Sequence, residues 1–366
     1  MKKISYLLTP TVDLDIDVHG GMERAALCIL EQAVKAGYDA RLWVGRLTGT
    51  APKVSSLARI VFKNRIAQYL YYLVFGCINF HSKIFHGHYT PALCLLFPKK
   101  SVLHFHGLAI TELPLYRFFR KRYEQVDYIF NAEWVRGEFR KKYPLLPIHK
   151  LHLIYYGIDS MWTGTRVYRK SNNTCIRVLF IGGWIRKKGV IDFINAIERA
   201  NEQKPCIEGF MAGSAFSHYQ NEESEALDRE IRDRCARSGC VRLVGNVKRQ
   251  DLPGFLEGMD IGVVPSVFRE PFGLVSLEMM SSGMPVIAYD IGGLREQIVN
   301  NKTGFLVTHG SPVAIADKIV WFVDHQDQIE LFGRAAHAHV ASTFSWEKHF
   351  KALETIYLKK AGKKWK

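Results

Sequence analysis

The stretch EPFGLVSLE places two carboxylates, Glu270 and Glu278, eight positions apart around a proline and a glycine. Two carboxylates in one short segment can act as general acid and base, ligate a metal ion, or accept hydrogen bonds from a hydroxyl-rich substrate. A glycosidase pair would face across a bond at roughly 5–9 Å, which a glutamate inside a helix does not match. The spacing alone leaves acid–base chemistry open.

The residues around this pair favour hydroxyl binding. A strand-like run, Ile261–Pro265, precedes Glu270, and a helix-like run, Leu274–Met280, carries Glu278 about two turns from its start. The amides of Gly273 and Leu274 would point out of the helix start, where backbone N–H groups and the helix dipole favour phosphate. Carboxylates beside a phosphate would then accept sugar hydroxyls, so the segment fits a nucleotide sugar. A surface glutamate with a helix-capping partner is the structural alternative.

Two other groups have residue types suited to metal ions. The segment Asp13-Leu-Asp-Ile-Asp17 has alternate carboxylates that can ligate a hard cation, but it lies in the first βα loop. The pairs His86-Gly-His88 and His104-Phe-His106 could suit zinc, but no carboxylate or cysteine stands at ligand spacing. We expect no metal site and no cofactor, with the histidines lying in the core or the cleft.

Strand-length apolar runs alternate with helical patterns along the chain, which predicts parallel sheets with right-handed crossovers. The first βαβ unit joins Ile4–Leu8 and Ala40–Val44 through a helix from Met22 to Ala36 that Gly37 stops. Further strands are expected at Lys83–His86, Ser101–His106, Tyr128–Phe130, His152–Tyr155, Ile176–Ile181, Cys206–Met211, Val241–Val244, Ile261–Pro265, Pro285–Ala288 and Gly304–Val307.

A polar stretch at residues 163–174 interrupts this series and is typical of a linker. We therefore predict an α/β protein with two Rossmann-like domains, residues 1–165 and 175–345. A helix and basic tail at residues 346–366 complete the chain. Ligands of such sheets bind at the carboxyl ends of the strands, so the expected site is the cleft between the two domains.

Charge is unevenly distributed. Residues 1–170 hold 25 lysines and arginines against 12 acidic residues, a net charge of +13, whereas the rest has 25 and 23, a net charge of +2. Such asymmetry suggests a polyanionic partner, either nucleic acid or an anionic membrane. Basic residues alternate with bulky apolar ones in Arg59–Phe75 and Leu115–Tyr123, as in interfacial helices, which favours the membrane. Core-facing helices with solvated basic faces are the alternative.

Compartment signals are consistent with the cytoplasm. The seven cysteines are scattered without a CxxC, which suits a reducing compartment. No signal-peptide pattern opens the chain, and no apolar run approaches the roughly 20 residues that span a bilayer. We expect a cytoplasmic protein, peripheral on the inner face of the plasma membrane, that does not bind nucleic acid.

The run from Val241 to Val307, centred on EPFGLVSLE, resembles the donor-binding half of the retaining GT-B glycosyltransferases of family 4. The segments His19–Arg24, Val102–Gly107 and Tyr156–Asp159 extend the resemblance to the family's opening glycine loop, histidine strand end and turn before the linker. The resemblance implies a GT-B fold whose last helix crosses back to the first domain.

The resemblance also implies residue roles. Glu278 would bind the ribose hydroxyls and Glu270 the sugar hydroxyls, while Lys188 would neutralise the departing diphosphate in place of a metal ion. His106 would lie beside the reacting sugar, through its ring or its carbonyl. Other donor-binding positions are expected at Gly20, Gly21, Asn246, Val247, Phe272, Gly273, Leu274 and Val275.

One departure from the family concerns the phosphate clamp. The family has Gly-Arg five residues before the lysine, whereas this chain has Gly182-Gly183. Arg186 or Lys187 would reach the same oxygens from a different backbone position. This compensation is a hypothesis about the donor site.

The resulting function is a metal-independent retaining transferase. It would move a sugar from a nucleotide diphosphate to a lipid-linked or cell-surface glycan acceptor, with lipopolysaccharide, O-antigen and capsule as the types considered. A nucleotide-sugar epimerase on the same fold and an inactive membrane-associated scaffold are the alternatives. The departure at Gly183 is the only support for the scaffold.

Overall fold

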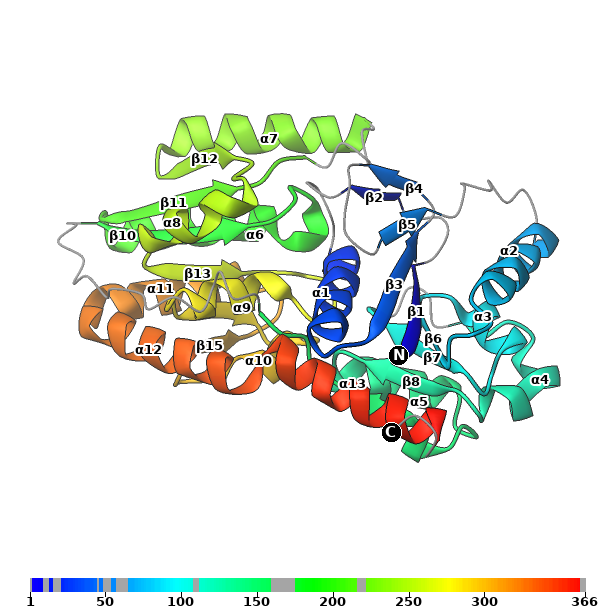
Figure 1. The fold of residues 1–366 in the computed structure, drawn as a ribbon. Helices are drawn as coiled ribbons and strands as arrows, with labels where there is room; N and C mark the ends of the chain where they lie inside the picture. Colours follow the sequence, from blue (N-terminus) through cyan, green and yellow to red (C-terminus); the bar gives the residue numbers. More distant parts are fainter. Residues whose placement is uncertain are drawn as a thin grey trace. The chain divides into compact units, whose positions relative to one another are not determined.

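The structure is a computed structural model that describes residues 2–8, 13–15, 21–44, 46–48, 54–56, 65–107, 112–158, 175–215 and 222–362. The chain divides into two compact units (Figure 1): the first unit is residues 1–157 with 345–366, and the second is residues 158–344. The predicted boundaries are at 165 and 345, and the expected linker at 163–174 lies outside the described residues. The cleft expected between the units stays a prediction.

A seven-stranded parallel sheet forms the centre of the described first unit. In spatial order its strands are β5 (Val54–Ser56), β3 (Asp39–Val44), β1 (Lys3–Leu8), β6 (Ile84–His88), β7 (Ser101–Phe105), β8 (Asp127–Phe130) and β9 (Leu151–Leu153). Strands β6, β7 and β8 are buried along their whole length, as expected for a parallel sheet covered on both faces. The strand order reverses between β1 and β6, which makes this the switch point where such sheets bind ligands.

Helices connect these strands as the sequence predicts. They are α1 (Gly21–Lys35), α2 (Arg65–Ile78), α3 (Pro91–Leu96), α4 (Tyr116–Tyr123) and α5 (Glu133–Lys142). Helix α1 buries an apolar stripe that includes Ala26 and Ile29, and it is followed by Gly37 at φ +82°, a left-handed conformation that glycine adopts without strain. The sequence did not reveal β5, nor the short pair β2 (Asp13–Asp15) and β4 (Arg46–Thr48).

The last helix, α13 (Trp346–Ala361), belongs to the first unit although the second unit precedes it in the chain. The Ser345 side chain caps it by accepting a hydrogen bond from the Lys348 amide at 3.1 Å. A Cβ on Gly157 would lie 2.0 Å from the Trp346 amide nitrogen, so only glycine permits this approach. The predicted return of the last helix to the first domain is confirmed.

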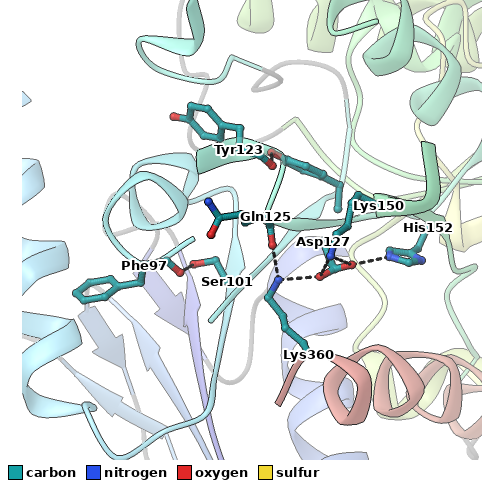
Figure 2. Close-up of polar contacts among 9 residues, drawn as sticks. Phe97, Ser101, Tyr123, Gln125, Asp127, Lys150, His152 and Lys360 are labelled. Carbon is teal, nitrogen blue, oxygen red and sulfur yellow. Dashed lines mark hydrogen bonds and ion pairs between the residues drawn. The ribbon is translucent and has the colours of Figure 1, made fainter. Parts of the chain in front are cut away.

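A buried carboxylate ties the end of α13 to the sheet (Figure 2). The Lys360 ammonium donates to Asp127 Oδ2 and to the Gln125 carbonyl, both at 2.7 Å. Asp127 also accepts hydrogen bonds from Lys150 at 3.1 Å and from His152 at 3.0 Å. Burial by itself raises the pKa of the Asp127 carboxyl, but these three donors together hold that pKa far below its ordinary value.

The second unit contains a six-stranded parallel sheet in its described part. In spatial order its strands are β12 (Val241–Gly245), β11 (Ile207–Ala212), β10 (Ile176–Ile181), β13 (Ile261–Val264), β14 (Val286–Tyr289) and β15 (Gly304–Val307). This is the 3-2-1-4-5-6 order of a Rossmann sheet, with its switch point between β10 and β13. Two Rossmann-like units are thereby confirmed.

Helices and short 3₁₀ turns complete the second unit. The helices are α6 (Val190–Gln203), α7 (Glu222–Ser238), α8 (Leu252–Glu257), α9 (Leu274–Ser281), α10 (Leu294–Gln297), α11 (Pro312–Asp324) and α12 (Gln326–Thr343), with 3₁₀ turns η3 (Arg186–Lys188) and η5 (Arg249–Asp251). The core packs side chains of α6 and α11 against the sheet, among them Phe193, Ile197, Ile315 and Ile319. Within the described part of the chain, no helix is both long and apolar enough to cross a bilayer.

Candidate functional site

Lys188 and Glu270 meet at the switch point of the second unit. The turn η3 follows β10 and carries Lys188, and the loop after the neighbouring strand β13 carries Glu270. The Lys188 ammonium donates to Glu270 Oε2 at 2.8 Å, and the Ser266 hydroxyl donates to the same oxygen at 3.2 Å. The Lys188 ammonium also lies 5.0 Å from the centre of the Phe268 ring. The structure therefore joins the predicted phosphate-binding lysine to the predicted sugar-binding carboxylate.

A glycine fixes how closely the two loops approach. Gly189 has φ +75°, and a Cβ there would lie 1.8 Å from the Pro265 carbonyl oxygen. The Val267 amide donates to the Lys187 carbonyl at 3.0 Å, which locks η3 to the loop that leaves β13. These backbone contacts therefore fix the main chain of Lys188, from which its flexible side chain extends.

The start of α9 is held by a polar network. Gln297 is fully buried, and its amide nitrogen donates to the Phe272 carbonyl at 2.8 Å. Ser276 donates to the Gly273 carbonyl at 2.7 Å and is also hydrogen-bonded to the Gln297 side chain. Gly273 is the N-cap of α9. The amides of Leu274 and Val275 have no carbonyl partner within the helix by its geometry, whereas the Ser276 amide donates to the Gly273 carbonyl at 3.1 Å. This helix start can hold an anion.

A second pair of glycines packs against the backbone of Glu270. Gly292 has φ +58°, and a Cβ on it would lie 2.5 Å from the Glu270 carbonyl oxygen. The Gly293 amide donates to the same carbonyl at 2.9 Å. The glycine pair after β14 thus fixes the main chain of the signature loop.

Glu278 lies on α9 with 7% of its surface exposed. Arg249, the first residue of η5, donates to Glu278 Oε1 at 3.2 Å. The segment before η5 carries Asn246 and Val247, and the Asn246 side chain accepts a hydrogen bond from the Ser214 hydroxyl at 3.0 Å. Arg249 thus links the predicted ribose-binding carboxylate to the segment that carries the predicted donor-binding positions Asn246 and Val247.

The two residues expected to compensate for Gly183 face different partners. Arg186 donates to Glu230 of α7 at 2.7 Å, in an exposed ion pair. The Lys187 ammonium lies 5.8 Å from the centre of the Phe268 ring, the ring that Lys188 also approaches. Of the two, Lys187 shares its surroundings with Lys188, and the compensation itself stays a prediction.

The first unit places His106 directly after β7. Its Nδ1 is hydrogen-bonded to the Tyr156 hydroxyl, and its Nε2 lies 2.9 Å from His88 Nδ1. Burial lowers the pKa of His106 well below its ordinary value, and the neighbouring His88 and His349 lower it further. The ring is therefore neutral and has both nitrogens engaged within the unit, while its carbonyl lies 3.5 Å from the Asn131 amide nitrogen.

A stack of buried imidazoles adjoins His106. His86, His88 and His104 are fully buried, and each offers a ring nitrogen within 4.8 Å of the others. His86 Nε2 and His104 Nδ1 are 3.3 Å apart, and His86 Nδ1 is 2.5 Å from the Tyr357 hydroxyl. The ring planes of the three histidines are inclined by 18° to 35°, and nearly parallel rings do not aim three in-plane lone pairs at one point. The geometry is that of a hydrogen-bonded stack, and the expected lack of a metal stays a prediction.

The remaining predicted residues have backbone placements only or fall outside the structure. Gly21 is the exposed first residue of α1, while Gly20 lies outside the described residues. Asp13 and Asp15 belong to strand β2 rather than to a loop, and Asp17 lies outside the described residues. Most of the predicted site residues therefore lie in the second unit, while His106 and Gly21 lie in the first unit.

Comparison with known proteins relates most of the second unit to a known family. Residues 166–339, which contain both signature carboxylates and Lys188, match the family model described as glycosyl transferases group 1. We call this part of the chain the group 1 domain, after the family model that it matches. The group 1 domain covers most of the second unit, so the resemblance stated from EPFGLVSLE is confirmed.

Relatives of the group 1 domain include several named transferases. The chain is 29% identical over 181 residues to a glycogen synthase of Mycobacterium tuberculosis, which is 50% of this chain and 42% of the relative. It is 37% identical over 182 residues to a D-inositol 3-phosphate glycosyltransferase of Corynebacterium jeikeium, again 42% of the relative, and 49% of this chain. It is 27% identical over 190 residues to the capsular polysaccharide biosynthesis glycosyltransferase CapM of Staphylococcus aureus, 52% of this chain and 48% of the relative. The chain thus spans less than half the length of each of these relatives.

Solved structures match the whole chain at low identity. A glycosyltransferase from Rickettsia africae has a TM-score of 0.81 at 19% identity, covering 99% of this chain and 100% of that one. Anabaena HepE in complex with UDP and glucose has a TM-score of 0.74 at 17% identity, covering 97% and 99%. WaaG, a glycosyltransferase involved in lipopolysaccharide biosynthesis, has a TM-score of 0.71 at 17% identity, covering 96% and 99%. These likenesses show the GT-B fold for the group 1 domain together with the first unit.

Several residues that build the site have no signal in the sequence pattern. Ser276, Gln297 and Ser266 orient the signature loop, yet each is an ordinary polar residue in its own segment. The pair Gly292-Gly293 directly after a predicted strand is a turn signal that points to close backbone contact. Arg249 meets a partner 29 positions away, so no local spacing predicts that contact.

Proposed function

We propose that the protein is a retaining, metal-independent glycosyltransferase that uses a nucleotide-diphosphate sugar as donor. The observation that carries this proposal is the contact between Lys188 and Glu270 beside the start of α9, at the switch point of a Rossmann sheet. A cation and an anion-binding helix start suit a diphosphate, while Glu270 and Glu278 flank them as hydroxyl acceptors. Anabaena HepE, which shares the fold, forms a complex with UDP and glucose, and this supports a nucleotide sugar as the donor.

In the proposed reaction, the acceptor oxygen bonds to the anomeric carbon on the face from which the diphosphate leaves. The bond between the anomeric carbon and the phosphate oxygen breaks, and its electron pair goes to the diphosphate. The acceptor's proton passes to a phosphate oxygen, so no enzyme nucleophile is required. Lys188 and the amides at the start of α9 stabilise the charge that develops on the leaving group, which is the part a metal ion plays in other enzymes.

His106 is proposed to bracket the donor sugar from the first unit. Both of its ring nitrogens are already hydrogen-bonded, which favours its backbone carbonyl as the contact for a sugar hydroxyl. In that role the ring fixes the carbonyl's position. Gly20 and Gly21 are proposed to lie under the donor phosphates or near the acceptor, as the resemblance implies.

The acceptor is proposed to be a lipid-linked or cell-surface glycan, reached at the inner face of the plasma membrane. CapM and WaaG are named for capsular polysaccharide and lipopolysaccharide biosynthesis, which supports this class of acceptor. The net charge of +13 on residues 1–170 suits an anionic membrane surface.

Helices α2, α3 and α4 lie side by side in the first unit, with α3 in contact with both of the others (Figure 1). We propose that exposed residues of α2, of α4 and of the turns beside them form one membrane-binding surface, the basic-aromatic face: Leu73, Val74, Ile78, Phe80, Leu115, Phe118 and Phe119, with basic Arg117, Arg120 and Lys121. Phe118 is 81% exposed, although a phenylalanine is usually buried in a soluble core. Basic side chains interleaved with exposed aromatic ones are typical of helices that lie in a membrane interface. The first part of the predicted segment, residues 59–64, lies outside the described residues.

The donor proposal is tested by incubating the protein with UDP-, GDP- and ADP-sugars in the presence of EDTA. We expect slow release of the nucleoside diphosphate from one donor class, and a fall of about 10²–10³-fold in Lys188→Ala. Lys187→Ala and Arg186→Ala test the compensation for Gly183. The matched control is Lys204→Ala, because Lys204 is an exposed lysine of the same unit that pairs with Asp324 at 2.7 Å. Isomerisation of the sugar would favour the epimerase instead, and no binding of any donor would favour the inactive scaffold.

The membrane proposal is tested by co-sedimentation with liposomes that contain phosphatidylglycerol. We expect binding to fall steeply as the salt concentration rises from about 50 to about 500 mM, because salt screens the attraction between the basic residues and the anionic lipid. Phe118→Ser with Lys121→Ser should weaken binding, whereas Leu331→Ser, an equally apolar exposed site on α12, should not. Binding that does not depend on salt would contradict the basic-aromatic face as the contact. Equal binding by the Phe118→Ser, Lys121→Ser variant and by Leu331→Ser would contradict it as well.

A further inference from the structure

Arg249 stands between the two elements proposed to hold the nucleoside. It begins η5, directly after the segment that carries Asn246 and Val247, and it donates to Glu278 Oε1 on α9 at 3.2 Å. The Arg249 side chain is 31% exposed and that of Glu278 is 9% exposed. The contact between the Arg249 guanidinium and the Glu278 carboxylate therefore lies near the protein surface rather than in the core.

The backbone around Arg249 is well anchored. The amides of Asp251 and Leu252 donate to the Lys248 carbonyl at 2.9 and 3.1 Å, and Leu252 is largely buried at the start of α8. Pro253 follows directly and is accommodated in the first turn of that helix. A rigid 3₁₀ turn thus presents the guanidinium to α9 from a fixed position.

An anionic donor creates the need for such a cation. A carboxylate with little solvent around it loses hydration, and a diphosphate bound nearby repels it. Glu270 already has Lys188 as its counter-charge, at 2.8 Å. Arg249 supplies the equivalent counter-charge to Glu278, so that each signature carboxylate has a cation as its partner beside the proposed diphosphate.

We propose that Arg249 is a positioning residue for the nucleotide: it holds the Glu278 carboxylate in the orientation that accepts hydrogen bonds from the ribose hydroxyls. The inference rests on the proposed function, because it requires a nucleoside diphosphate in this site. Arg249 acts through Glu278, so its contribution depends on the ribose hydroxyls. A role in holding the phosphates or the fold would not depend on them.

That dependence gives the experiment. The full-length protein is titrated calorimetrically with the nucleoside diphosphate that wild type binds among UDP, GDP and ADP, and with its 2′,3′-dideoxy analogue. For Arg249→Met we expect affinity for the diphosphate to fall roughly tenfold or more, as on loss of a charge-assisted contact, and affinity for the analogue to change less than about threefold. Arg249→Lys should recover part of the loss, and Arg249→Met with Glu278→Gln should bind no more weakly than Glu278→Gln alone.

Arg242→Met is the matched control, because Arg242 lies on β12 of the same unit and pairs with Glu208 at 2.7 Å. Its affinity for both ligands should equal that of wild type. An equal loss for both ligands in Arg249→Met, or unchanged binding of the diphosphate, would overturn the inference while leaving the proposed function intact. A wild-type protein that binds none of the three diphosphates would overturn the proposed function, and the inference with it.

Discussion

Asp127 of the first unit and the signature carboxylates of the second unit are all paired with cations, yet their surroundings differ. The Asp127 side chain is 8% exposed and accepts hydrogen bonds from Lys150, His152 and Lys360. The Lys360 side chain is itself only 5% exposed, whereas Lys150 and His152 are 22% and 26% exposed. The Asp127–Lys360 pair joins β8 to α13, so it is part of what holds the last helix to the sheet.

The signature carboxylates have accessible partners instead. Lys188 and Arg249, which pair with Glu270 and Glu278, are 30% and 31% exposed. Both cations lie in 3₁₀ turns that follow strands at the carboxyl edge of the sheet, where such folds bind ligands. Both partners are buried in the Asp127–Lys360 pair, whereas the cation stays accessible in each signature pair, as the proposed donor binding requires.

The buried histidines of the first unit show a further effect of their surroundings, which is on their pKa values. Burial lowers the pKa of His88 to about 3 and that of His349 to about 4, because a buried imidazole is disfavoured in its charged form. His86 and His104 shift in the same direction for the same reason, and neighbouring histidines add to the shift. The first unit therefore contains a set of neutral rings that protonation would disrupt.

The largest expected effect is acid destabilisation confined to the first unit. In the unfolded chain these histidines have the ordinary pKa near 6.5, whereas in the folded protein their pKa values are lower. Above about pH 6.5 the rings are neutral in both states, so they do not lower the free energy of unfolding there. As the pH falls below about 6.5, each such imidazole lowers the free energy of unfolding by roughly 1.4 kcal/mol per pH unit until its folded pKa is reached. Between pH 7 and pH 5, His88 and His349 together account for a loss of about 4 kcal/mol.

Hydrogen exchange at the two pH values, corrected for intrinsic rates, measures this effect in each unit. Peptides that cover β6 and β7 should lose protection at pH 5, while peptides that cover β13 and β14 should keep it. The Asp127 carboxyl has a lowered pKa and so adds a further loss only below about pH 4, the ordinary value for aspartate. Equal losses of protection in both units would contradict the assignment to the histidine stack.

The sequence predicts the second unit better than the first for a physical reason. Its strand–loop–helix segment from Ile261 to Ser281 brings a helix start, a left-handed glycine and two carboxylates together within one local motif. The contacts of Lys188 and Arg249 with that motif depend on strand order, which sequence spacing alone does not fix. The family resemblance predicts a role for Lys188, whereas the contact that Arg249 makes is seen only in the structure.

In the first unit, the polar clusters are assembled from distant parts of the chain. The stack of imidazoles requires β6, β7 and α13, whose residues His86 and Tyr357 are 271 positions apart. The two histidine pairs are visible in the sequence, but their shared burial cannot be inferred from it because alternate residues on a strand indicate a face and not its neighbours. The three donors to Asp127 likewise come from two distant segments, since Lys150 and His152 are two positions apart and Lys360 lies on α13.

The next largest effect is expected from removing the charge of Asp127. Asp127→Asn should lower the free energy of unfolding by about 3 kcal/mol, because it leaves the buried Lys360 without its counter-charge. Chemical unfolding at pH 7 measures the loss, and donor affinity should stay at the wild-type value. Asp290→Asn, in an exposed pair with Arg295, should change stability by less than about 1 kcal/mol. A loss that Lys360→Met does not relieve in the double variant would count against the ion pair as its cause.

The smallest effects separate the two signature carboxylates from each other. Glu278→Ala should chiefly weaken nucleotide binding, because its proposed ribose contacts exist equally in the bound state and in the transition state. Glu270→Ala should chiefly lower kcat, because its proposed contacts to the donor sugar and to Lys188 act where charge redistributes. Each change is expected to be about tenfold to a hundredfold, the range for losing a charge-assisted hydrogen bond.

Calorimetric Kd values for the nucleoside diphosphate and steady-state kcat values separate the two variants. The thermal unfolding temperature should shift little, since both carboxylates face accessible cations. If both variants lost affinity and turnover in the same proportion, the two carboxylates would share one role, and the division between ribose and sugar would be wrong.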